Sequence, residues 1–124
     1  MGAFTVNTRN NVLGWLVGKA NPPSVGPRYL AMYNGDPQAG GTEVYQRVEV
    51  TSKMGTPAAG SVSNTADIMW PRTTTSVGTV THLAMFDASS GGTMLASGSL
   101  VAVVAIGPNV TPTIPAGQLV ISMV

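Results

Sequence analysis

The chain has 124 residues, a net charge of +1 and no cysteine, and only 9% of its residues are charged, against about 25% in an ordinary soluble domain. The lack of cysteine excludes disulfides and cysteine-based metal sites. Six Lys and Arg residues are too few for a nucleic-acid-binding face. A net charge near zero favours association, so either much of the surface is interface or it is a neutral surface rich in hydroxyl groups.

The length predicts a single domain over residues 1–124. No apolar run reaches the about 18–20 residues that span a membrane, and no basic and apolar signal sequence opens the chain. We therefore expect no membrane partner.

The first 22 residues predict an N-terminal helix or arm. Apolar residues at helical spacing between Val12 and Val17 indicate a short helix from about Asn7 to Val17. Gly18 and the Pro22-Pro23 pair provide its end. Three turns of helix do not persist alone in water, so we expect the helix to pack on the body of the domain or on a neighbour.

After Pro27 the pattern indicates short β-strands. Turn signals separate them, and residues 51–65 are rich in Gly, Pro and Ser and are expected to form one long loop. The pattern favours a mainly β fold, an antiparallel β-sandwich of jelly-roll-like type with a short N-terminal helix, or a small barrel. The expected strands cover residues 28–34, 43–50, 66–71, 79–86, 93–98 continuing through 100–106, 110–114 and 118–124.

Alternation within two of these strands predicts which side chains share a face. In the strand over 43–50, three valines share one face, and Glu43, Tyr45, Arg47 and Glu49 share the other, which faces solvent or a partner. In the strand over 79–86, the side chains of Val80, His82, Ala84 and Phe86 share one face, opposite Leu83 and Met85. Both faces of that strand become apolar, which is typical of a central strand.

The segment from Gly78 to Gly98 contains the single histidine, His82, followed by Asp87, Ser89 and Ser90. These residue types could supply a catalytic triad, but His82 and Asp87 are expected to point to opposite faces of one strand, about 17 Å apart. No GxSxG elbow is present. Gly91-Gly92 is expected to form a hairpin turn. We therefore expect no catalytic residue, no cofactor and, with one histidine and scattered carboxylates, no metal site.

Five residues are candidates for contact with a partner. Trp15 lies on the marginal helix and Trp70 lies just before Pro71, and each could serve either the core or an interface. The other three candidates, Tyr45, Arg47 and Glu49, share the polar strand face, where simple solvent exposure is the alternative.

Several sequence blocks, taken together, resemble a family of small tailed-bacteriophage virion proteins, often labelled tail fibre or minor structural proteins. The blocks are "NNVLGWLVG", "PRYLAMYNGDP", "GGTEVYQRVEV", "NTADIMWP" and "GTVTHLAMFDASSGGTMLASGSL". The last block is the most specific, and Trp70 stands where the family usually has Phe. The resemblance covers nearly the whole chain and implies a non-enzymatic virion component.

The sequence is consistent with three functions. The first is a capsid cement or decoration protein on the outside of the head, which binds the major capsid protein and copies of itself as a homo-oligomer, with many weak contacts adding up. The second is a tail component, either fibre-associated or a tail-tip adaptor. The third is a host-glycan-binding module that uses Tyr33, Tyr45 or Trp70.

Overall fold

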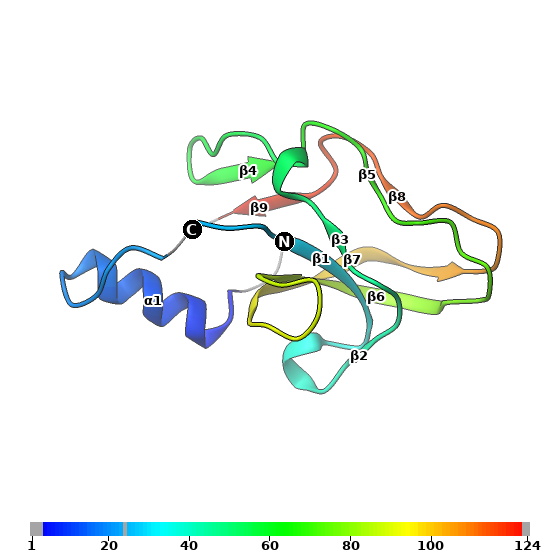
Figure 1. The fold of residues 1–124 in the computed structure, drawn as a ribbon, viewed down its shortest axis with the longest axis horizontal. Coiled ribbons are helices and arrows are strands. Elements are labelled where there is room, and N and C mark those ends of the chain that lie inside the picture. Colours follow the sequence, from blue (N-terminus) through cyan, green and yellow to red (C-terminus); the bar gives the residue numbers. More distant parts are fainter. Residues whose placement is uncertain (1–3, 24, 123–124) are drawn as a thin grey trace.

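The computed structural model describes residues 4–23 and 25–122. Its architecture is mainly β, with antiparallel strands and one α-helix (Figure 1). Residues 1–3 of the expected N-terminal arm and 123–124 of the expected last strand lie outside the described residues. No helix of the described part is both long enough and apolar enough to span a lipid bilayer.

The larger sheet has the order β2–β1–β6–β7, and β3 also pairs with β1. Its centre is the pair of β1 and β6, and β6 continues through a hairpin into the longest strand, β7. The strands of this sheet are β1 (Tyr29–Asn34), β2 (Thr42–Glu43), β3 (Val48–Glu49), β6 (Gly78–Phe86) and β7 (Met94–Ile106).

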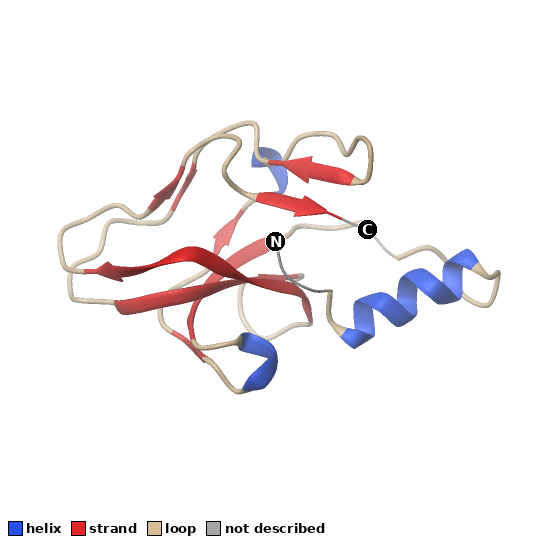
Figure 2. Cartoon of the chain, turned by 180° about the vertical axis from the view of Figure 1, so that it is seen from behind, coloured by secondary structure: helices blue, strands red, loops and turns tan. Residues whose placement is uncertain are grey.

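Two short ribbons form a second layer over this sheet, as the view from behind shows (Figure 2). One pairs β4 (Ser61–Ser63) with β9 (Val120–Ser122), and the other pairs β5 (Ile68–Met69) with β8 (Thr113–Ile114). Two 3₁₀ turns, η1 (Pro37–Ala39) and η2 (Thr51–Lys53), complete the described elements together with α1 (Val6–Leu16). The mainly β, antiparallel fold with a short N-terminal helix is therefore confirmed.

The main core lies between the two layers and a smaller cluster lies on the opposite face of the sheet. The main core contains Leu30, Met32, Val50, Ile68, Trp70, Val80, Leu83, Ile106 and Leu119. The smaller cluster contains Ala31, Tyr33, Ala84 and Phe86, with Met94 packed against it. The alternation of β1 thus divides its side chains between two apolar environments, as expected for a central strand.

Two polar side chains in the core fasten the second layer. The amide of Asn64 donates to the carbonyls of Ala66 and Pro115, and its oxygen accepts the N–H of Leu119 at 2.9 Å. The hydroxyl of Thr73 donates to the carbonyl of Gly107 at 2.8 Å. Both side chains are buried and, because they are hydrogen-bonded, their burial is not costly.

Three expectations about strands were wrong. Residues 43–50 do not form one strand: between β2 and β3, the four residues 44–47 face only two residues of β1, which breaks the alternation. Residues 51–65 are not one loop, because they contain η2 and β4. Val80 does not share a face with Ala84 and Phe86 but lies in the main core, because the pairing of β6 with β7 is irregular between Val80 and His82.

Candidate functional site

The histidine and carboxylate of the β6–β7 hairpin contact different neighbours. The Nδ1 atom of His82 lies 2.8 Å from the hydroxyl of Thr81. The carboxylate of Asp87 accepts the N–H of Thr93 at 2.7 Å and so closes the hairpin loop, in which Gly91 and Gly92 have positive φ. Both glycines therefore have the conformation that the expected turn requires. Within the described residues no three His, Cys, Asp or Glu side chains gather as metal ligands would.

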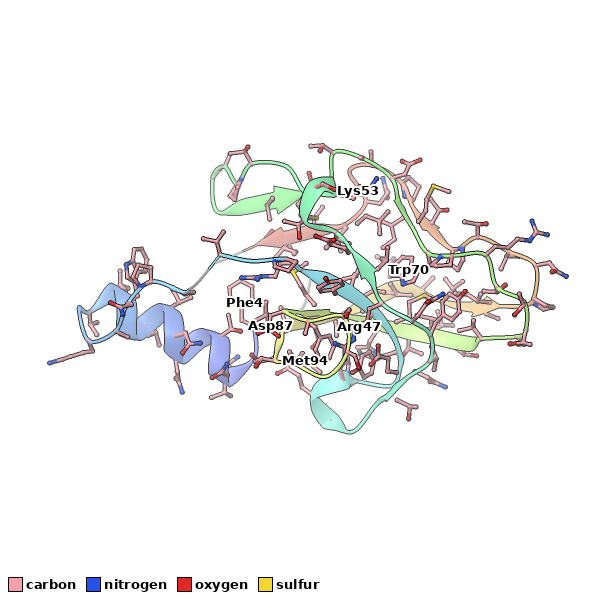
Figure 3. The ribbon with its side chains drawn as sticks, in the orientation of Figure 1. Phe4, Arg47, Lys53, Trp70, Asp87 and Met94 are labelled. Carbon is pink, nitrogen blue, oxygen red and sulfur yellow. The ribbon has the colours of Figure 1, made fainter. Side chains whose placement is uncertain are left out.

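Arg47, a candidate interface residue, is engaged inside the fold (Figure 3). Its guanidinium forms an ion pair with Glu43, with Nε 3.0 Å from Oε2, and donates to the carbonyls of Ala88 and Gly91 at 2.8 Å each. Its Cζ atom lies 3.6 Å above the ring of Phe86. Only 7% of the Arg47 side chain is exposed. Arg47 therefore ties the hairpin loop to the segment between β2 and β3.

A buried tyrosine lies beside this group. The ring of Tyr33 stacks on Phe86, with centroids 6.4 Å apart. Burial raises the pKa of the Tyr33 hydroxyl, the charge of Glu43 raises it further, and the charge of Arg47 opposes both effects.

Three further candidate residues differ in their exposure. Trp70 is only 2% exposed and packs in the main core, where its indole N–H has no hydrogen-bond partner among the described residues (Figure 3). The hydroxyl of Tyr45 donates to the carbonyl of Pro71 at 2.8 Å, whereas Glu49 is exposed. Tyr33 and Trp70 are buried and Tyr45 is partly buried. These three aromatic residues therefore do not form the exposed stacking platform that glycan binding would need.

The fifth candidate, Trp15, belongs to a helix that projects from the body. In Figure 1, α1 extends to one side of the sheets, and none of its residues is buried. Four large apolar side chains near its C-terminal end are substantially exposed: Leu13, Trp15, Leu16 and Val17, between 48% and 68%. We call these four residues the arm tip. The expected helix is confirmed, but it does not pack on the body of its own chain.

The root of the helix is attached to the edge of β7. Phe4 pairs with Ala96 of β7, and the N–H of Thr5 donates to the carbonyl of Leu95 at 3.0 Å. The hydroxyl of Thr5 accepts the N–H of Thr8 as the N-cap of α1 and donates to the carbonyl of Met94 at 2.9 Å. One threonine thus both begins the helix and fastens it to the sheet.

An apolar groove lies between β7 and the second layer. It consists of two adjoining cavities, of about 370 Å³ and about 650 Å³. Leu83, Leu100, Val104, Thr113 and Ile114 line both cavities. Among the described residues, no charged side chain lines either cavity. The first cavity is lined by Trp70 and by both residues of β8. In Figure 1, β8 lies toward the end of the molecule away from α1.

The groove was not foreseen from the sequence, although β7 was. Between Ser99 and Val104, the four residues 100–103 of β7 face the single residue Thr81 of β6. This bulge leaves Val101, Val103 and Val104 exposed. The signal in the sequence was the uncharged run "LVAVVAI", but such a run is equally typical of a fully buried strand.

Comparison with known proteins identifies a relationship along almost the entire chain. A family model described as "Podophage GP4 fiber I protein gp80" matches residues 3–122. A search among curated proteins finds no match to this chain. The family match confirms the resemblance to phage virion structural proteins and places the chain among virion components.

Proposed function

We propose that this chain, which belongs to the family of the podophage GP4 fiber I protein gp80, is a non-enzymatic structural component of a phage tail-fibre assembly. The family's description supports the tail alternative better than the capsid-cement hypothesis. A fibre shaft would need elongated repeats, and none is evident in 124 residues. The chain therefore fits a compact subunit that joins other subunits rather than a shaft, and its partners are other tail proteins or further copies of itself.

The observation that carries this proposal is the exposed arm tip. A large side chain presents about 150–250 Å² when fully exposed, so four side chains exposed by about one half to two thirds offer about 450 Å² of apolar surface. Covering that area gains about 11 kcal/mol at ~25 cal/mol per Å², before the costs of association. An isolated helix of three turns is marginal in water, and no residue of α1 is buried by its own chain. The arm therefore has the properties of an attachment element that another subunit covers.

The location is tested by counting copies in purified virions. Quantitative mass spectrometry, with the major capsid protein of the same particles as the reference, gives the ratio of the two chains. We expect far fewer copies than of the major capsid protein, and antibody labelling at the tail. A ratio close to one copy per capsid subunit, with label over the head, would instead support the cement hypothesis.

The role of the arm is tested by virion incorporation of Leu16→Asp. We expect the variant to fold, because Leu16 is 68% exposed, and to be lost from particles, because a charge at the arm tip opposes its burial. Asn11→Asp is the matched control, since it places the same charge on another side of the helix at an exposed position. Incorporation of Leu16→Asp at the level of the control would contradict the proposed role of the arm.

A further inference from the structure

We infer that the apolar groove of one copy receives the arm tip of a second copy, so that copies of this chain join head to tail. The inference rests on the proposed function and names the subunit that covers the arm. The chain displays two apolar surfaces that its own fold leaves open, one projecting and one recessed. They lie on different parts of the molecule, with α1 at one end and β5 and β8 toward the other (Figure 1).

The chemistry of the two surfaces matches. The arm tip consists of three aliphatic side chains and one indole, and the described residues that line the groove are all uncharged. Docking therefore buries no unpaired charge, which is the main penalty in such a contact. Leu13, Leu16 and Val17 follow the i, i+3, i+4 spacing with which a helix places anchors in an apolar groove.

The size of the groove also fits. Its cavities, of about 370 Å³ and about 650 Å³, are in the range that proteins use to enclose a compact apolar group, about 300–1,000 Å³. The helix root is held to β7 by the contacts of Phe4 and Thr5, so the arm is presented at a fixed place on the body. Such preorganisation lowers the entropy that docking costs.

The buried area favours a head-to-tail arrangement over a pairing of two arms. If the groove loses about as much surface as the arm tip, one contact buries about 900 Å² in total, which is below the about 1,200–2,000 Å² of a stable interface. In a head-to-tail assembly each copy takes part in two such contacts, one through its arm and one through its groove, so each copy loses about 900 Å² of its own surface, twice the about 450 Å² per copy that a pairing of two arms would bury. Such contacts form a closed ring or an open chain according to the rotation between neighbours.

The test uses the purified full chain and two single variants. Leu16→Asp disables the arm tip and leaves the groove intact. Val104→Asp disables the groove, at a side chain that is 46% exposed, and leaves the arm intact. Asn11→Asp and Val103→Asp are the controls, because Asn11 is outside the arm tip and Val103 is exposed but lines neither cavity. Circular dichroism verifies folding, and Val110→Asp is a second groove variant if Val104→Asp unfolds.

Molar mass by light scattering decides the outcome. We expect the unaltered chain and both controls to form assemblies larger than a dimer, and each disabled variant to be monomeric. A mixture of the two disabled variants should give a one-to-one heterodimer and nothing larger, because it contains one intact arm type and one intact groove type.

Three results would overturn the inference. The unaltered chain could remain monomeric at all concentrations, which would show that the arm tip has a different protein as its partner; Leu16→Asp would then still be lost from virions, and the proposed function would stand. The mixture could form no heterodimer; a pairing of two arms would instead give dimers of Val104→Asp alone, because its arm is intact. Val104→Asp could assemble like its control, which would show that the groove is not the receiving surface.

Discussion

Replacing Arg47 by Met should strongly destabilise the fold, because its guanidinium is buried and fully engaged. The substitution keeps most of the apolar stem but removes the ion pair with Glu43, the bonds to Ala88 and Gly91, and the contact with Phe86. Hydrogen bonds to a charged group contribute about 1.5–3 kcal/mol each. The Glu43 side chain is 29% exposed, so water can hydrate its carboxylate after the substitution and offsets part of the lost interactions. We therefore expect the free energy of unfolding to fall by about 3–4 kcal/mol in total, near the cost of breaking a buried pair.

Urea unfolding monitored by circular dichroism measures this fall in the free energy of unfolding. In a domain of this size it corresponds to a fall in Tm of about 10–20 °C. Arg72→Met is the control, because Arg72 is exposed and surface substitutions change stability by about 0.5 kcal/mol or less. A double-mutant cycle with Glu43→Gln isolates the ion pair. An Arg47→Met protein within about 1 kcal/mol of the unaltered chain would refute the reasoning.

Three further predictions concern groups inside the fold. Asn64→Ala should cost about 3 kcal/mol in urea unfolding, because it leaves buried partners such as the N–H of Leu119 unpaired; an unchanged unfolding midpoint would contradict the fastening role. Thr73→Val should cost about 1–3 kcal/mol for the same reason at the carbonyl of Gly107. Folding raises the pKa of Tyr33 above 10.0, so the unfolded chain loses this proton first and stability should fall as the pH rises above that value. In Tyr33→Phe, the urea midpoint should decline less between about pH 8 and pH 11 than it does in the unaltered chain. Equal declines in the two proteins would argue against a contribution of the Tyr33 hydroxyl.

The local sequence pattern was sufficient to predict the β6–β7 hairpin and its loop, because the apolar strand, the glycine pair and Asp87 lie close together in sequence. It was insufficient for the face of Val80, which the irregular pairing of β6 with β7 determines. It was also insufficient for residues 43–50. Their alternation predicts one strand, but Arg47 reaches the hairpin loop and Tyr45 reaches Pro71. These contacts lie 26 residues or more away in sequence, and residues 45–47 leave the ladder to make them, whereas the N–H of Val44 still donates to the carbonyl of Met32 at 3.0 Å.

The same limit applies to β4 and to the candidate site. β4 has no strong strand pattern of its own and exists through its pairing with β9, which lies near the C-terminal end of the chain. The apolar spacing of α1 predicted a helix that packs on something, but this spacing is identical for a helix that covers its own core and one that covers a neighbour's. The exposure of the arm tip and the opening of the groove follow from the tertiary arrangement, which periodicity does not describe.

The position of β7 has a mechanical consequence. Its first residues hold the root of the arm through Phe4 and Thr5, and its later residues, Gly98 to Ala102 and Val104, form a wall of the groove. In a head-to-tail assembly of the proposed kind, tension would enter each copy at one end of this strand and leave near the other. Between those points it would travel along the covalent backbone of a single strand, braced by β6 on both sides of the bulge, without crossing the core. The head-to-tail assembly would then be strongest along the direction in which a fibre is pulled.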